Sequence, residues 1–320
     1  MSRELYQFDS GHSSDMYQAK FMPGDLMITS CARDGQVRLA EISVTGELRS
    51  DKKIGKHKGA ANRMSLVPDC PYVVLSAGSD GQVLSVDIRE QKPDKILLLK
   101  NEYENKMPIY SIHSSPSNGN LFCTSGQDQY IRIFDRRFLG RDVPGGQVVK
   151  FSPDNVKDGS FDLFEAHTTS SVFSEDGQAV IGSYSDEVIY MFNTQDPEGS
   201  KQVHQYQGHR NATFLMGVNF YGQNSKYIIS GSDCGNIFIW DRQTEGLVKL
   251  IPGYDKLELS EFDHDNSHGI VIEPHPTLPV LATSAQDNEV KLWLPLEVTT
   301  EPDHCWEREQ KQYMLRTVHK

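Results

Sequence analysis

The chain has 320 residues, of which 37% are hydrophobic and 24% charged, and its formal net charge is −12. These proportions are ordinary for a folded domain, and no run of 18 apolar residues is present to span a membrane. The negative charge argues against direct nucleic-acid binding, which relies on Lys and Arg neutralising phosphates. The N-terminus lacks a secretory signal, and five scattered cysteines predict a reducing compartment. We therefore expect an intracellular protein, in the cytoplasm, the nucleus or both.

One sequence motif recurs along the chain. Each copy has a small Ser/Gly/Ala cluster, an Asp/Gly tight turn, a run of strand-forming residues, then an aromatic residue and an acid. In chain order the copies, some of which match the motif only in part, lie at 31–41, 76–87, 125–135, 182–193, 230–241 and 283–293. Successive copies are about 50 residues apart. A period near that length, with recurring Gly-His and Trp-Asp dipeptides, is the signature of WD40 blades.

The repeat predicts an all-β fold, a WD40 β-propeller with six recognisable blades. The ring is either six-bladed or part of a seven-bladed one. Residues 1–297 are assigned to the propeller and residues 298–320 to a polar C-terminal tail, with a helix expected around 307–315. Residues 5–8 resemble a stray outer strand, which would complete the last blade and close the ring without a free edge.

A Gly-His or Lys-His pair precedes several blades, and the Asp of the tight turn lies at the same end of the blade. A repeated His–Asp pair satisfies buried polar groups and is predicted to lock a turn rather than to catalyse. In the fifth blade Cys234 occupies the usual Asp position, with Asp233 one residue earlier. The residues assigned to structural turn-locking are His12, Asp34, His57, Asp80, His209, Asp233 and Asp241.

The sequence predicts no catalysis. No Gly-x-Ser-x-Gly elbow, Gly-x-Gly-x-x-Gly loop or Walker loop is present. His264, His268 and His275 lie close together in the sequence. His264 and His268 have an i, i+4 spacing, which suits metal ligands only on a helix, and this segment is expected to be a loop. We therefore expect no enzyme activity, no metal site and no cofactor.

Two successive repeats end with an Arg two residues after the acid, in Val86-Asp87-Ile88-Arg89 and Phe134-Asp135-Arg136-Arg137. Equivalent positions in neighbouring blades place both arginines at one end of the ring, opposite the His/Asp turns. Guanidinium groups are suited to bidentate carboxylate pairing and to interface hot spots. The alternative that stays open is that each Arg only pairs with its own Asp.

This Asp-x-Arg ending resembles the docking motif of WD40 proteins that serve cullin-4 ubiquitin ligases. The similarity extends beyond the motif, over roughly residues 5 to 295, to the subfamily of cullin-4-associated factor eight. The segments that carry it lie at 18–21, 31–38, 57–60, 208–211, 217–222, 230–235 and 273–284.

The resemblance implies a non-catalytic substrate receptor of a cullin-4 RING E3 ubiquitin ligase. Arg89 and Arg137 would bind the damaged-DNA-binding-protein adaptor of the ligase, Asp87 and Asp135 would hold the arginines, and an unknown protein substrate would be presented for ubiquitination. The substrate would contact loops at the His/Asp end or the central channel, and no membrane or direct nucleic-acid partner is implied. The alternative is a general WD40 interaction scaffold without ligase association.

Overall fold

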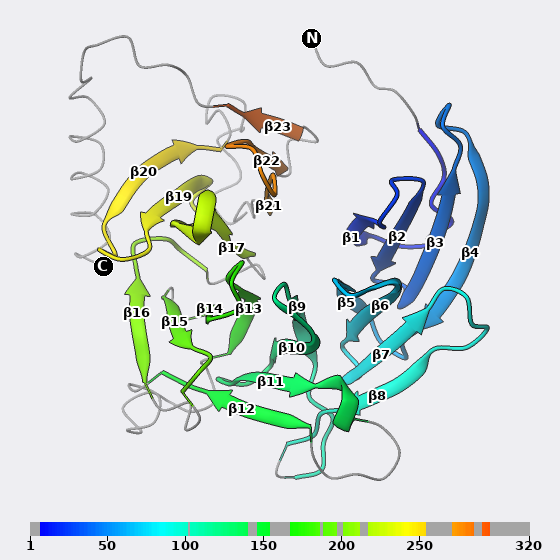
Figure 1. Cartoon of the computed structure of the whole chain (residues 1–320), viewed down its shortest axis with the longest axis horizontal. Coiled ribbons are helices and arrows are strands. Elements are labelled where there is room, and N and C mark those ends of the chain that lie inside the picture. The colour runs from blue at the N-terminus through cyan, green and yellow to red at the C-terminus, as the bar shows by residue number, and fades with distance from the viewer. Residues whose placement is uncertain are drawn as a thin grey trace, which may run out of the picture.

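The computed structural model describes residues 7–101, 103–139, 146–153, 167–185, 188–196, 201–211, 217–253, 271–284 and 290–294. Five antiparallel sheets of four strands and one of three follow one another around a central axis (Figure 1). Within each sheet, consecutive strands pair in chain order, which is the meander of a propeller blade. The prediction of an all-β propeller with six blades is confirmed. The described segments contain no helix of the length and apolarity that a bilayer crossing demands.

Blade one comprises β1 (Met16–Phe21), β2 (Met27–Ala32), β3 (Gln36–Ile42) and β4 (Leu48–Lys56). Blade two comprises β5 (Ala61–Val67), β6 (Cys70–Gly78), β7 (Gln82–Asp87) and β8 (Asp94–Leu98). Blade three comprises β9 (Ile109–Ser115), β10 (Asn118–Gly126), β11 (Ile131–Asp135), the 3-10 turn η1 (Arg136–Phe138) and β12 (Gln147–Phe151).

Blade four comprises β13 (Thr168–Phe173), β14 (Ala179–Tyr184), β15 (Ile189–Asn193) and β16 (Gln202–Tyr206). Blade five comprises β17 (Val218–Tyr221), η2 (Gln223–Ser225), β18 (Tyr227–Gly231), β19 (Asn236–Asp241) and β20 (Leu247–Pro252). Blade six comprises β21 (Val271–Pro274), β22 (Leu281–Ser284) and β23 (Val290–Trp293).

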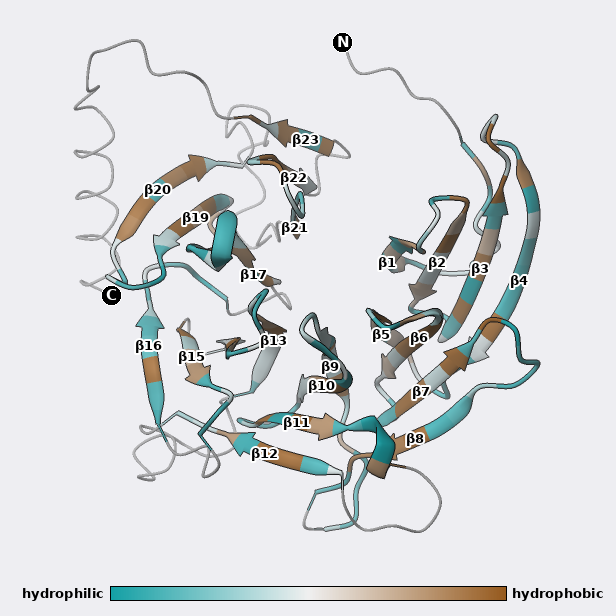
Figure 2. Cartoon of the chain, in the orientation of Figure 1, coloured by the Kyte–Doolittle hydropathy of each residue, from teal (hydrophilic) through white to brown (hydrophobic). Residues whose placement is uncertain are grey.

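The core lies between neighbouring blades. Phe122 and Phe134 of blade three stack with ring centres 5.6 Å apart and join one buried cluster with Val83 of blade two. Burial of each such side chain stabilises the fold by about 1.5–3 kcal/mol. Figure 2 shows brown, hydrophobic segments on strands of several blades, among them β7, β19 and β20, while many connecting turns are teal. Packing between sheets therefore joins each of these blades to its neighbour.

The tight turn between the second and third strands depends on glycine in blades one, two and five. Gly35, Gly81 and Gly235 have φ angles of 78°, 74° and 79°, in the region that side chains with a Cβ disfavour. At Gly81 an added Cβ would lie 2.9 Å from the Met107 carbonyl oxygen. In these three blades the glycine is thus a requirement of the turn between the second and third strands.

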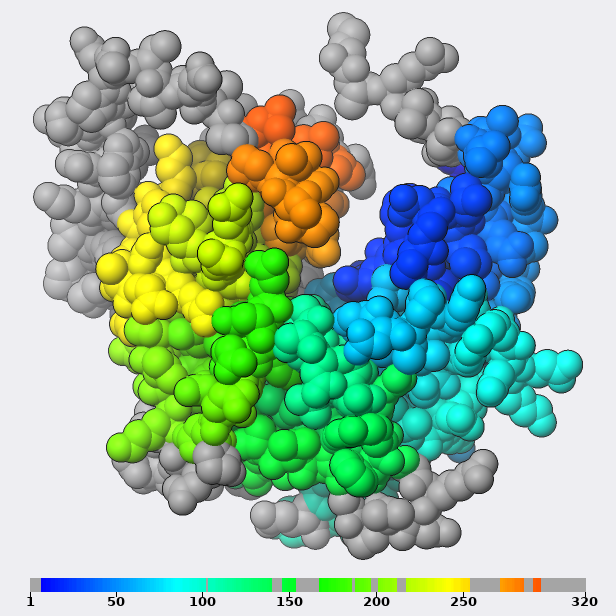
Figure 3. Space-filling view, viewed as in Figure 1, coloured from blue at the N-terminus to red at the C-terminus, as the bar shows by residue number. Residues whose placement is uncertain are grey.

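Among the described residues, blade six and blade one lie on either side of a notch, between orange and blue atoms in Figure 3. Large apolar side chains are exposed on both blades, among them Phe21 at 58% and Leu292 at 63%. In the described part of the chain, β23 has no fourth strand beside it. Residues 5 and 6 of the expected closing strand lie outside the described residues, and residues 7 and 8 are not in a strand. The assigned tail at 298–320 also lies outside them.

Candidate functional site

Arg89 is held by its own motif at the end of β7. Asp87 Oδ1 accepts hydrogen bonds from the Arg89 backbone N–H at 3.0 Å and from Nε at 2.9 Å, while Nη2 donates to Oδ2 at 2.6 Å. The guanidinium also lies over the Tyr72 ring, 4.6 Å from its centre. These hydrogen bonds keep the pKa of Asp87 below its ordinary value. The carboxylate therefore holds both the turn and the side chain of Arg89.

Arg137 repeats this geometry one blade further on. Asp135 Oδ1 accepts from the Arg137 backbone N–H at 3.0 Å and from Nε at 3.0 Å, and Nη2 donates to Oδ2 at 2.6 Å. The hydrogen bonds from Arg137 lower the pKa of Asp135. The side chains of Arg89 and Arg137 remain 63% and 59% exposed. Pairing with the neighbouring Asp and accessibility to a partner are thus compatible, so the two interpretations of the motif do not exclude each other.

Two contacts tie blades two and three together at this end. Arg136 Nη2 donates to the Cys70 sulfur at 3.0 Å, and the Gly119 N–H donates to Asp69 Oδ2 at 3.0 Å. Cys70 begins β6, whose exposed Tyr72 supports Arg89. The two arginine motifs end the third strands of neighbouring blades, and we call their residues the arginine face: Asp87, Arg89, Asp135, Arg137 and Tyr72.

The same turn occurs in blades four and five without the arginine. Asn193 Oδ1 accepts from the Gln195 N–H at 2.9 Å, and Asp241 Oδ1 accepts from the N–H groups of Gln243 and Thr244 at 3.0 and 2.9 Å. An Asp or Asn side chain that caps the N–H two residues later is a common turn device. The acid thus has a structural role in several blades, and the arginine is the feature that distinguishes blades two and three.

The histidine pairs lie at the other end of the blades. His57 Nδ1 is 3.0 Å from Asp80 Oδ1, and its Nε2 is 3.0 Å from the Ser76 hydroxyl. In blade one, His12 Nδ1 lies 3.3 Å from Asp34. Asp34 also accepts the Ser13 backbone N–H, and Asp80 accepts that of Lys58. Desolvation raises the pKa of Asp34, but the hydrogen bonds that its carboxylate accepts outweigh it and lower the pKa to about 2. The structure brings both predicted His–Asp pairs into contact.

His209 departs from that pattern. Neither of its ring nitrogens has a hydrogen-bond partner in the described part of the chain, so the expectation of a hydrogen-bonded lock at His209 is wrong. Its ring instead packs edge-to-face on Trp240, with centres 5.6 Å apart, and burial lowers its pKa to about 4. The physical reason is Cys234, which occupies the position of Asp34 and Asp80 and offers no carboxylate.

The fifth turn is closed by other groups. The Asp233 N–H donates to the Arg210 carbonyl oxygen at 3.0 Å, and the Arg210 N–H donates to the Ser232 hydroxyl at 2.9 Å. Ser232 therefore replaces the carboxylate as acceptor for the residue after the histidine. Sequence reasoning missed this serine, although its place two residues before Cys234 was the available signal.

The described residues hold no group of three or more His, Cys, Asp or Glu side chains placed to bind a metal. His275 is a described residue, and its Nδ1 accepts hydrogen bonds from the N–H groups of Thr277 and Leu278 at 3.2 and 3.0 Å. That arrangement makes His275 part of a local loop. His264 and His268 lie outside the described residues.

Comparison with known families matches the description "WD domain, G-beta repeat" at residues 3–40, 99–135 and 200–241. Each matched segment ends at or near the third strand of a blade. The chain is a WD40-repeat propeller. A solved structure, the Myceliophteria thermophila Cps50 (Swd1) β-propeller domain, superposes with a TM-score of 0.66 over 89% of this chain and 85% of that one, at 16% identity. That likeness supports the fold of the propeller alone.

Among curated proteins, this WD40 chain is similar to DDB1- and CUL4-associated factor 6. The human protein is 30% identical over 204 residues and the mouse protein 31% over 204 residues. Protein ALTERED SEED GERMINATION 2 of Arabidopsis thaliana is 28% identical over 239 residues. The matches cover 58% to 63% of this chain but only 22% to 31% of those proteins, so the propeller corresponds to a fraction of their length.

Proposed function

We propose that this WD40 propeller is a non-catalytic substrate receptor of a cullin-4 RING ubiquitin ligase, related to the subfamily of cullin-4-associated factor eight. Support comes from the likeness to a protein named as associated with DDB1 and CUL4. Further support comes from the arginine face, which contains two copies of the Asp-x-Arg motif that resembles the docking motif of such receptors. The ligase adaptor, DDB1, is the partner proposed for that face.

The observation that carries the proposal is that both arginines are preorganised and exposed. Arg89 and Arg137 are each fixed by two side-chain hydrogen bonds to an Asp, yet both keep more than half of their side chain accessible. A side chain already ordered loses less conformational entropy when it binds. Arginine on a rigid support is also a common hot spot of protein interfaces. These properties fit a docking surface better than a solvated loop.

A protein substrate would occupy another surface. The histidine turns lie at the opposite end of the strands, roughly 20 Å away for six strand residues. Arg210, beside His209, is exposed there. Separation of the two ends lets one face dock on the adaptor while the other remains free for a substrate.

The test is capture from cell extract with the parent chain, Arg89→Ala/Arg137→Ala and Arg210→Ala, each read by mass spectrometry. We expect the cullin-4 adaptor with the parent and with Arg210→Ala, and its loss with the double variant. Retention of the adaptor by a folded double variant would refute the docking role of the motif. Absence of the adaptor from every sample, with other partners retained, would favour the scaffold without ligase association.

A further inference from the structure

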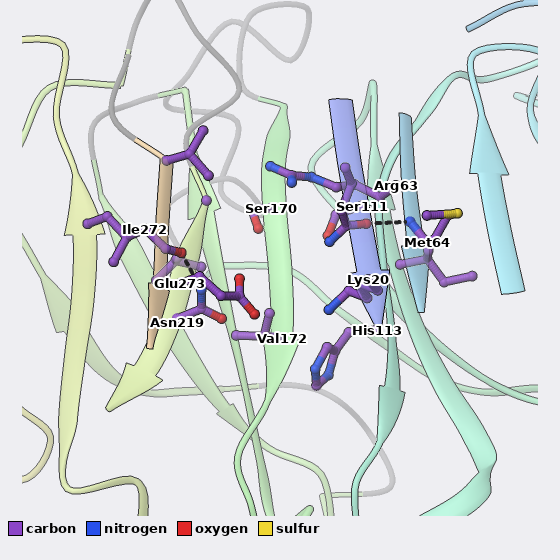
Figure 4. A pocket seen from close by; sticks show the side chains of 15 residues that line it. Lys20, Arg63, Met64, Ser111, His113, Ser170, Val172, Asn219, Ile272 and Glu273 are labelled. Carbon is purple, nitrogen blue, oxygen red and sulfur yellow. Dashed lines mark hydrogen bonds between the residues drawn. The ribbon is translucent and has the colours of Figure 1, made fainter. Parts of the chain in front are cut away.

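A cavity of about 90 Å³ lies in the central channel, where the inner strands of the blades meet (Figure 4). Its wall includes polar side chains from four blades, which are Gln18 and Lys20 on β1, Arg63 on β5, His113 on β9 and Glu273 on β21. Sites for drug-sized ligands occupy about 300–1,000 Å³. This cavity therefore has room for one small polar group rather than for a whole metabolite.

Some polar groups of the wall serve to join neighbouring blades. Gln18 Oε1 accepts the Met64 N–H at 2.7 Å, and Asn219 Nδ2 donates to the Ile272 carbonyl oxygen at 3.0 Å. Both contacts appear as dashed lines in Figure 4. Each satisfies a backbone group of the next blade. These two side chains have a structural task and need no ligand.

Arg63 is different. It extends into the channel, where its Nη2 comes within 3.8 Å of the position that a Cβ on Gly217 would occupy (Figure 4). No hydrogen bond or ion pair within 4 Å joins its guanidinium to any described residue, and burial lowers its pKa. Arg63 is half-buried, so its guanidinium gives up part of its hydration without gaining a close protein partner. Such a group is a strong candidate for a ligand contact.

Lys20 and His113 line the same cavity, below Arg63 in the view of Figure 4. The Lys20 ammonium likewise has no hydrogen-bond partner among the described residues. His113 Nδ1 accepts the Phe173 N–H at 3.2 Å, while burial and the neighbouring Lys20 lower the pKa of His113 to about 3. The ring is therefore neutral with its proton on Nε2. Figure 4 shows Arg63, Lys20 and His113 directed toward the cavity from adjacent strands.

The charge of the wall selects the ligand. Lys20 and Arg63 each carry one positive charge, Glu273 on the opposite wall carries one negative charge, and His113 is neutral. The sum is one positive charge, within a protein whose net charge is −12. A single carboxylate would balance it, whereas a phosphate dianion would leave excess negative charge beside Glu273. Arginine also binds carboxylates with two parallel hydrogen bonds.

We propose that Arg63, Lys20 and His113 form a carboxylate-binding site in the central channel. Arg63 provides the bidentate contact, Lys20 provides the second charge, and His113 Nε2–H provides a neutral donor. The carboxylate belongs either to an acidic side chain of a partner polypeptide or to a small free acid. The site lies apart from the arginine face, so its occupation does not depend on the ligase adaptor.

The test measures the thermal stability of the whole chain as acetate replaces chloride at constant ionic strength, because a ligand of the folded state raises the unfolding temperature. We expect acetate to stabilise the parent. Arg63→Gln and Lys20→Gln should each weaken acetate binding by about tenfold or more, since each removes a charged hydrogen bond. The matched controls Arg49→Gln and Lys249→Gln, exposed on outer strands, should bind as the parent does.

Glu273→Gln gives an independent test at an exposed position, where folding is not at risk. It raises the charge of the wall by one, so inorganic phosphate should gain affinity relative to acetate. A parent that acetate does not stabilise, or that binds phosphate more tightly than acetate, would overturn the proposal. Equal losses in the control variants would overturn it as well.

A second arm identifies the source of the carboxylate. Blocked pentaglycine peptides with a central Asp or Asn are titrated by calorimetry against the parent and Lys20→Gln. Binding of only the Asp peptide, lost in Lys20→Gln, assigns the site to an acidic side chain of a partner. Acetate binding without peptide binding assigns it to a free acid. Equal binding of both peptides would contradict recognition of the carboxylate.

Discussion

The guanidinium of Arg89 lies 4.6 Å from the centre of the Tyr72 ring while it pairs with Asp87 at 2.6 Å. Tyr72 comes from β6, so two strands of blade two fix one arginine. A cation over an aromatic face gains about 0.5–1 kcal/mol at an exposed site. The arginine is consequently presented in one orientation.

Tyr72→Ala should weaken adaptor binding without unfolding the propeller. Tyr72 is 43% exposed, so its loss removes support for Arg89 more than it removes core packing. We expect a three- to fivefold weaker affinity, corresponding to about 0.5–1 kcal/mol. Calorimetric titration against purified adaptor measures the change, and Tyr72→Phe, which retains the ring, is the control. An unchanged affinity for Tyr72→Ala would show that Arg89 needs no such support.

The repeat predicted the arrangement of strands well, because each blade needs the same turn and the same buried strand. The aromatic position of the repeated motif lies in the third strand of every blade, where it is occupied by Ala40, Val86, Phe134, Phe192, Trp240 and Trp293. The arginine pair was also visible, since it depends on local spacing. The channel site was not, because Lys20, Arg63 and His113 are far apart in sequence and meet only when blades pack. The stacking of His209 on Trp240 likewise depends on packing that no local motif encodes.

Cys234→Asp should stabilise the protein. It places a carboxylate at the position that Asp34 and Asp80 occupy in blades one and two, beside an unpaired histidine ring. A hydrogen bond gained by a buried polar group contributes about 1 kcal/mol. Urea denaturation of parent, Cys234→Asp and Cys234→Ser measures the free energy of unfolding. A gain in Cys234→Ser equal to that in Cys234→Asp would show that the carboxylate is not the cause.

Stability should fall as the pH is lowered from about 6.5 to about 4, partly through His209. Burial lowers its folded pKa to about 4 from an ordinary 6.5, so the unfolded chain takes up a proton in this range before the folded chain does. The free energy of unfolding then decreases with falling pH by up to about 1.4 kcal/mol per pH unit. His209→Leu should reduce that slope in urea denaturation at several pH values. An identical slope would mean that His209 takes up its proton in the folded protein at the same pH as in the unfolded chain.

Blade six should exchange its backbone amides faster than blades two and three. Its three strands include exposed Val290 and Leu292, whereas every residue of β11 is buried. Amides of segments with few buried contacts open with a lower free energy. Hydrogen–deuterium exchange read by mass spectrometry compares β22 and β23 with β10 and β11. Equal protection would show that blade six is as stable as the centre of the array.

Equilibrium binding of purified DDB1 adaptor to the purified chain tests the docking account most directly. Two hot-spot arginines each contribute about 2 kcal/mol, so Arg89→Ala/Arg137→Ala should raise the Kd by about a hundredfold or more, and Arg210→Ala should leave it unchanged. Circular dichroism verifies that each variant is folded. A double variant that binds the adaptor as tightly as the parent would contradict the account.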